Sequence, residues 1–174
     1  MSAAHPTMRL ALLLCSDLAL RSGTALKVAP CNWSRDEGTV TVVSKFGHAV
    51  TLPVTDELQM LLSIAAEGQP PDSQVPFVDL LYGRRFCPST FQRQFQALRK
   101  QLGIGGAPRA LTAHDLRRTT AVRVLEITSD LRLVQALLGH RDLRHTFHYL
   151  DHRNTTVPRQ LLEAAKLASR KESE

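Results

Sequence analysis

A change in residue pattern near position 39 constrains most strongly how this chain can fold. Residues 39–44 (TVTVVS) and 48–53 (HAVTLP) are rich in β-branched side chains, which favour extended strands. The tripeptide Lys45-Phe46-Gly47 between them is typical of a hairpin turn. Patterns typical of helices surround this hairpin on both sides. We therefore predict a mainly α protein with a small three-stranded antiparallel sheet, an α+β fold.

Helical spacing of apolar residues accounts for most of the remaining chain. From Thr7 to Val28 it indicates one buried helix, which Pro30 ends. Residues 74–78 (QVPFV) are expected to return as a short edge strand. Further helices are expected over residues 56–66, 88–102, 112–127 and 130–139, from about 145, and over 157–170. Three of these helices begin after a residue suited to capping: Thr55, Thr112 and Asp130.

Length and composition narrow the class of protein. The chain has 174 residues, 43% of them hydrophobic, which suits one domain with its own core. Its apolar runs all fall short of the roughly 20 residues that a membrane helix needs, so no membrane contact is expected. The three cysteines are odd in number and lack metal-ligand spacing, which argues against a disulfide scaffold. A reducing cytoplasm is therefore the expected compartment.

Positive charge is concentrated in one window of the sequence. The formal net charge is +6, but residues 84–123 alone hold nine Lys or Arg and a single acid, Asp115. A basic stretch on a nearly neutral body indicates a polyanionic partner, most simply DNA or RNA. The alternative is a solvated basic face without a partner.

Six cationic or polar residues could carry chemistry, and they have no matching set of carboxylates. Arg21 is expected in the first helix and Lys45 at the hairpin tip, while His114 and Arg117 share one helical face. The set continues with His140 and Tyr149. Such an inventory suits a phosphodiester, because Arg matches two phosphate oxygens, His shuttles protons, Lys protonates a leaving oxygen and Tyr can attack. Metal-dependent nucleases gather Asp and Glu instead.

The order of these residues resembles the tyrosine recombinase (phage integrase) family. The resemblance spans about residues 8–152 and implies the fold of that family's catalytic domain. It also implies DNA cleavage without a metal, ATP or another cofactor. The motifs that carry it are Ala19-Leu20-Arg21, Lys45 in a hairpin ending Thr51-Leu52-Pro53-Val54, His114-x-x-Arg117, Leu138-Gly139-His140 and Tyr149.

The resemblance implies three roles in bond breaking and formation. Tyr149 would be the nucleophile that attacks the scissile phosphate, leaving a 3′-phosphotyrosyl link and a free 5′-hydroxyl. His114 would act as the general acid/base partner of Tyr149. Lys45 would protonate the departing 5′ oxygen.

Phosphate binding would fall to the remaining residues of the set. Arg21 and Arg117 would hold the non-bridging oxygens, and His140 would add a hydrogen bond to the phosphate. Other cations are expected to bind the DNA around the site: Arg84, Arg85, Arg93, Arg118, Arg141 and Arg144.

The sequence departs from the family pattern in two respects. The family usually has Gly two residues before the first arginine and an acid three residues after it, where this chain has Ala19 and Thr24. Family members also carry an N-terminal helical DNA-clamping domain, whereas residues 1–174 are expected to form a single catalytic domain. The family further implies that helix 157–170 docks on a neighbouring protomer in a tetramer on DNA, and the alternative is packing on its own domain.

Other functions remain open beside a site-specific recombinase or integrase, such as that of a mobile element. Residues 118–146 resemble a helix-turn-helix with Arg141 and Arg144 on its second helix, as in a DNA-binding regulator without catalysis. A degenerate recombinase remnant would look similar. A topoisomerase-like enzyme would use the same chemistry to relax DNA. Double-stranded DNA is the expected partner, and the expected location is cytoplasmic and nucleoid-associated.

Overall fold

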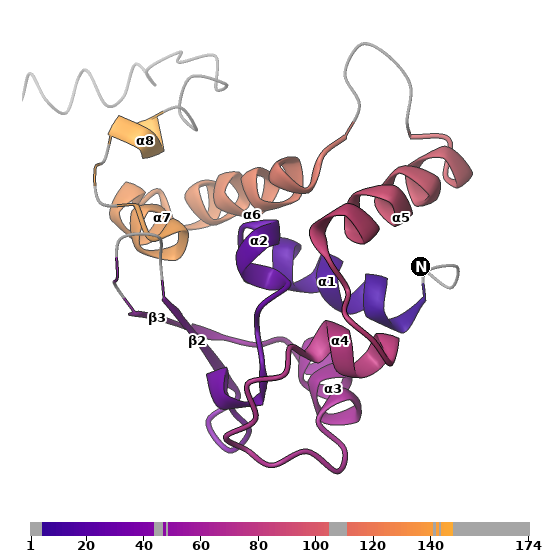
Figure 1. Cartoon of the computed structure of the whole chain (residues 1–174). Coiled ribbons are helices and arrows are strands. Elements are labelled where there is room, and N and C mark those ends of the chain that lie inside the picture. The colour runs from indigo at the N-terminus through magenta and orange to yellow at the C-terminus, as the bar shows by residue number, and fades with distance from the viewer. Residues whose placement is uncertain are drawn as a thin grey trace, which may run out of the picture.

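Helices form most of the structure, and a small sheet lies beside them (Figure 1). The structure, a computed structural model, describes residues 5–43, 47, 49–104, 111–140, 142 and 144–147. Among these described residues, every helix is too short or too polar to span a lipid bilayer. The elements are α1 (Pro6–Ser16), α2 (Ser22–Ala25), the 3₁₀ helix η1 (Pro30–Asn32), β1 (Trp33–Ser34), β2 (Thr39–Val43), β3 (Ala49–Pro53), α3 (Asp56–Ala65), α4 (Phe77–Tyr82), α5 (Pro88–Gln101), α6 (Ala113–Thr128), α7 (Leu131–Leu138) and α8 (Arg144–Phe147).

The hairpin prediction is confirmed. Strands β2 and β3 pair antiparallel, and Val40 lies opposite Leu52 on the buried face of the sheet. On the other face, the hydroxyls of Thr41 and Thr51 hydrogen-bond at 2.9 Å. This alternation is the pattern expected of a sheet with one face on the core. The observed fold class is the predicted one, mainly α with a three-stranded antiparallel sheet.

The third strand was predicted at the wrong place. It is β1, which pairs with β2 through Trp33 and Val40, whereas the second half of segment 74–78 opens helix α4. Phe77 is fully buried and packs edge-on against Trp33, with ring centroids 5.9 Å apart. A short apolar run does not by itself distinguish a strand from a buried helical turn. Here the apolar residues continue through residue 82, and the segment forms a helix.

The single helix predicted from Thr7 to Val28 is also wrong, because the chain turns between α1 and α2. Ala19 has a φ of +48°, in the left-handed region, which no α-helix can contain. Arg21 therefore lies outside the first helix, at the N-cap of α2. Apolar spacing continues through the turn because its residues are buried as well, which is why the pattern did not show the break.

Four other helices occur where the sequence predicts them, with bounds that differ by one or two residues. Thr55 accepts a hydrogen bond from the backbone N–H of Leu58 and caps α3. Thr112 and Asp115 form a reciprocal capping box at the start of α6. Asp130 accepts from two backbone N–H groups of α7. The predicted helix 157–170 lies outside the described residues.

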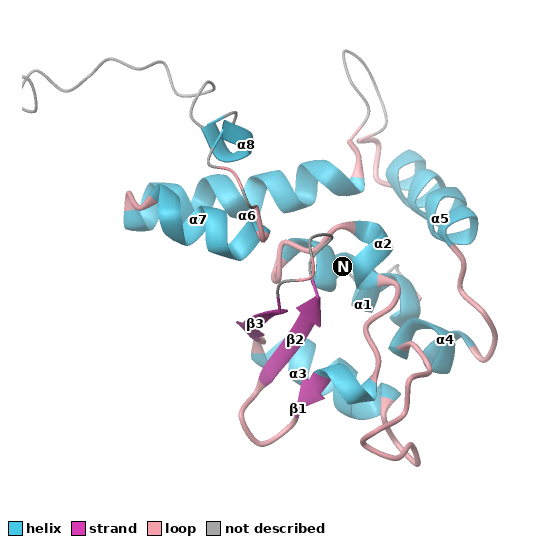
Figure 2. Ribbon diagram, turned by 60° about the vertical axis from the view of Figure 1, so that its left-hand side comes forward, coloured by secondary structure: helices cyan, strands magenta, loops and turns pink. Residues whose placement is uncertain are grey.

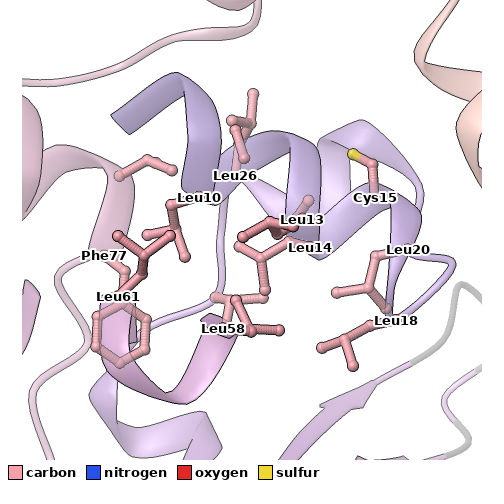
Figure 3. Packing of buried hydrophobic residues seen from close by; sticks show 14 of the residues in the cluster. Leu10, Leu13, Leu14, Cys15, Leu18, Leu20, Leu26, Leu58, Leu61 and Phe77 are labelled. Atoms are coloured by element: carbon pink, nitrogen blue, oxygen red, sulfur yellow. The ribbon is translucent and has the colours of Figure 1, made fainter. Parts of the chain in front are cut away.

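Helix α1 lies at the centre of the hydrophobic core. Leu10 and Leu14 are fully buried, and side chains of α1 point toward Leu58, Leu61 and Phe77 of α3 and α4 (Figure 3). On another side α1 packs against α6, and α6 packs in turn along α7 (Figure 2). Helix α7 also contacts β3. The end of α1, the middle of α6, the end of α7 and the hairpin strands consequently meet in one region.

Candidate functional site

Arg117 stands at the centre of this meeting point. Its side chain is only 3% exposed, although it carries a charge. Nη1 donates to the backbone carbonyl of Ala19 at 2.5 Å, and Nη2 donates to that of Leu138 at 2.7 Å. These carbonyls lie two residues before Arg21 and two residues before His140. Arg117 thus joins the two segments that carry the other phosphate-binding candidates.

Arg21 lines the same small pocket as Arg117. The Arg21 side chain is exposed, whereas that of Arg117 is buried. Valine and leucine side chains of the hairpin strands form one wall, so both charges border an apolar surface. The residues around the pocket are Leu20, Arg21, Thr24, Val42, Val43, Val50, Leu52, Arg117, Leu137, Leu138 and Gly139. None of these lining residues is a carboxylate.

His140 follows directly on the end of α7. Gly139 ends that helix in the left-handed conformation, with a φ of +56°, which glycine adopts without steric cost. The half-buried ring of His140 places Nδ1 3.1 Å from the hydroxyl of Thr146, which is itself fully buried. Gly139 lines the arginine pocket, and together with His140 it also lines an adjoining groove between α7 and β3. The other residues that line this groove are Ala49, Val50, Thr51, Arg132, Gln135 and Ala136.

His114 lies in the first turn of α6, three residues before Arg117 on the same side of the helix. Its side chain is exposed, and it is not among the residues around the arginine pocket. The capping box of Thr112 and Asp115 fixes the backbone on both sides of it. The structure therefore holds the His114 backbone on a rigid element and leaves its ring accessible to a bound molecule.

Lys45, Tyr149 and Arg141 lie outside the described residues, so their predicted roles stay predictions. The strands on either side of Lys45 are described, and Val43 and Val50 border the arginine pocket.

The predicted DNA-binding arginines lie on several elements. Arg84 and Arg85 are exposed after α4, and Arg93 is exposed on α5. Arg118 is half-buried on α6 and borders a shallow hollow along that helix. Arg144 of α8 is exposed and forms an ion pair with Asp142, with Nε and Oδ2 2.9 Å apart.

Sequence reasoning missed two residues that hold the site together. Arg99, counted in the basic window, donates from Nη1 to the carbonyl of Leu111 at 2.5 Å and so anchors the approach to α6. Thr120 donates its hydroxyl to the carbonyl of Ser16 at the end of α1. The sequence could have indicated Thr120 by its spacing, because it lies three residues beyond Arg117 on the same helix and therefore on the same face.

Two cysteines have shifted acidities with different physical causes. Burial raises the pKa of the Cys15 thiol from 9.0 to about 12, and the nearby charge of Arg117 opposes this only in part. Because the unfolded thiol ionises at lower pH than the folded one, the free energy of unfolding should fall as the pH rises above 9. Hydrogen bonds from Ser89 and then Thr90 lower the pKa of the Cys87 thiol to about 6.

We expect these acidities to separate the cysteines in alkylation by iodoacetamide. The rate at Cys87 should reach half of its maximum near pH 6, since the thiolate is the reactive form. Native Cys15 should stay unmodified at pH 8. Mass spectrometry of the peptides gives both rates, and Ser89→Ala should move the Cys87 midpoint upward. A midpoint unchanged by that substitution would refute the hydrogen-bond explanation.

Ala19 occupies the position at which the family usually has Gly. Its positive φ is a conformation that glycine takes freely and that costs an L-residue on the order of 1–2 kcal/mol. Its methyl group is fully buried beside Ala121, Leu125, Val134 and Leu138. The departure from glycine thus keeps the backbone of the turn and adds a packed methyl group.

The effect of a substitution at Ala19 on the free energy of unfolding should therefore depend on the shape of the new side chain. Ala19→Gly should change the free energy of unfolding by less than about 1 kcal/mol, because relief of the left-handed strain offsets the lost methyl contact. Ala19→Val should cost at least about 2 kcal/mol, since a β-branched side chain tolerates neither the positive φ nor the full burial. Urea denaturation of both variants measures the difference. Equal stability of the two would show that residue 19 has another backbone conformation.

A model of the phage integrase family matches residues 1–156. The tyrosine recombinase XerC of Azotobacter vinelandii is 36% identical over 116 residues, which make up 64% of this chain and 37% of that protein. XerC of Rhizobium meliloti is 30% identical over 139 residues, 75% of this chain and 41% of that protein. The chain thus spans less than half the length of these relatives.

Solved structures share the fold. XerA recombinase superposes with a TM-score of 0.66 at 22% identity, covering 92% of this chain and 56% of that one. The post-cleavage complex of XerH recombinase with a palindromic difH substrate gives 0.67 at 23% identity, covering 94% and 46%. At such identities the likeness establishes the fold, and it agrees with the fold predicted from the sequence.

Proposed function

The chain belongs to the phage integrase family, and on this premise we propose that it cuts and rejoins double-stranded DNA as the catalytic part of a site-specific recombinase. The observation that carries the proposal is the double hydrogen bonding of Arg117. It joins the segments of Arg21 and His140 beside one pocket, and none of the described residues that line this pocket is a carboxylate. Arg21 at this pocket and His140 in the adjoining groove are then the groups able to donate to phosphate oxygens.

The pocket suits a phosphodiester for electrostatic reasons. Arg21 is exposed at the pocket and can form the direct contact, while the buried charge of Arg117 adds attraction. The apolar wall from β2 and β3 lowers the local dielectric, so each charge acts more strongly than in water. Donors that are already in position when charge develops on the phosphate lower the barrier without further rearrangement.

The reaction would be a pair of transesterifications. The Tyr149 oxygen would attack phosphorus and form a phosphotyrosyl bond, while the bond to the 5′ oxygen breaks. His114 would accept the tyrosine proton, and Lys45 would give a proton to the departing 5′ oxygen. A 5′-hydroxyl of the partner strand would then attack the phosphotyrosyl bond and release Tyr149. Because the intermediate conserves the phosphodiester bond energy, the exchange needs no ATP.

The wider assembly is proposed on the same premise. Residues 1–174 would act as one catalytic domain, and residues 157–170 would dock on a neighbouring protomer in a tetramer on DNA. The solved XerH complex contains a DNA substrate, which supports DNA as the partner of this chain. The site of action would be the nucleoid, in the cytoplasm.

A recombinase fits better than a non-catalytic regulator. A regulator needs cations over a wide surface, whereas here Arg21 and Arg117 line one pocket. One arginine of the helix-turn-helix reading, Arg144, already pairs with Asp142.

The test is covalent capture of DNA by the full chain. A library of nicked duplexes with random sequence around the nick is incubated with the protein in EDTA and without ATP. We expect a protein–DNA adduct that survives denaturation, with one sequence enriched. Specific binding without any adduct would favour a regulator or an inactive remnant. Relaxation of supercoiled plasmid without strand exchange would favour a topoisomerase.

A further inference from the structure

Thr120 makes a contact that links two distant parts of the chain. This half-buried residue lies in the middle of α6, and its hydroxyl donates to the carbonyl of Ser16 in the last turn of α1. A second, longer contact of 3.3 Å reaches the carbonyl of Leu116 in its own helix. A hydroxyl has one proton to donate, and the shorter contact is the one between helices.

Arg117 and Thr120 act on the same short segment. They lie three residues apart on one face of α6. Thr120 binds the carbonyl of Ser16, and Arg117 binds that of Ala19. These two carbonyls flank the turn that leads into Arg21.

The turn is also held on its other sides. The N–H of Asp17 donates to the carbonyl of Leu13 at 2.8 Å, and that of Leu20 donates to Leu14 at 3.2 Å. The Asp17 carboxylate accepts from the Thr55 hydroxyl at 2.9 Å, which ties the turn to the start of α3. The contacts from α6 complete this set.

We propose that Thr120 is a positioning residue for DNA cleavage. Together with Arg117, Thr120 attaches residues 16–19 to α6 at two points, an arrangement that we call the two-point latch. This latch sets the position of Arg21 relative to His114, which also lies on α6. The inference rests on the proposed function. The apolar contact between α1 and α6 supplies packing between the helices, while the two hydrogen bonds determine the register of the turn.

Thr120→Val tests the latch, because it removes the hydroxyl and keeps the shape. The rate of adduct formation should fall about tenfold, the effect of one lost hydrogen bond on a positioned group, with DNA affinity unchanged. Thr120→Ser keeps a hydroxyl and should restore most of the rate. The matched control is Thr119→Val, since Thr119 is exposed and its hydroxyl donates to the carbonyl of Asp115 in its own helix. Equal rates for both valine variants would overturn the proposal.

A double-mutant cycle distinguishes positioning from general stability. In an Arg21→Lys background, Thr120→Val should cost less than about threefold, because the group that it positions has already been replaced. The same tenfold loss in both backgrounds would mean that Thr120 does not act through Arg21.

Hydrogen exchange gives a readout that needs no activity. The amide of Leu20 should exchange about tenfold faster in Thr120→Val than in Thr119→Val. Unchanged exchange would overturn the latch even in an active protein. If the unaltered chain forms no adduct, the proposed function fails, and the exchange measurement alone still decides whether the latch exists.

Discussion

Replacing Arg117 with alanine should lower the free energy of unfolding by about 3 kcal/mol and abolish adduct formation. The loss of stability follows because the carbonyls of Ala19 and Leu138 would stay buried without their donor. The loss of activity follows because the segments of Arg21 and His140 would no longer be joined. Few substitutions on α6 should act on folding and chemistry together to this extent.

One further variant separates charge from geometry at position 117, and a second serves as its control. Arg117→Lys keeps the charge but lacks the planar guanidinium. Its free energy of unfolding should therefore fall by about half as much as that of Arg117→Ala, and its rate of adduct formation should fall by at least about 100-fold. Arg123→Ala is the control, an exposed arginine of the same helix, and it should stay within about 0.5 kcal/mol. Urea denaturation compares the midpoints at constant slope. An Arg117→Ala variant as stable as the control would contradict the central place of Arg117.

Local patterns predicted those elements of the fold that local interactions define. The hairpin follows from β-branched alternation, and α3, α6 and α7 follow from apolar spacing with capping side chains at Thr55, Thr112 and Asp130. These signals lie within a few residues of what they determine. The break between α1 and α2 has a different origin, since the contacts that hold Ala19 in its left-handed conformation come from α6, about 100 residues later.

The site shows the same division. The spacing of His114 and Arg117 predicts a shared helical face, and the structure has it. The carbonyl partners of Arg117 lie 98 and 21 residues away, beyond the reach of any local pattern. A count of charges likewise does not show what each side chain contacts. Arg99 and Arg117 count toward the net charge of the basic window, yet both donate to backbone carbonyls within the fold.

The second large effect is expected at Tyr149. Tyr149→Phe removes only the phenolic oxygen, so the DNA affinity should persist while adduct formation falls by at least about 10³-fold. The chain offers a matched control, because it contains only one other tyrosine, Tyr82. That ring packs edge-on against Phe86, and its hydroxyl accepts from Arg84 at 3.3 Å. Tyr82→Phe should keep the adduct rate within about twofold.

The most direct measurement is therefore the site of covalent attachment. DNA captured by the unaltered chain is digested with nuclease, the protein is digested with trypsin, and mass spectrometry locates the remaining nucleotide. We expect it on the peptide that contains Tyr149, and we expect no adduct from Tyr149→Phe under the same conditions. An adduct of undiminished yield from Tyr149→Phe, or a nucleotide found on Tyr82, would contradict the account.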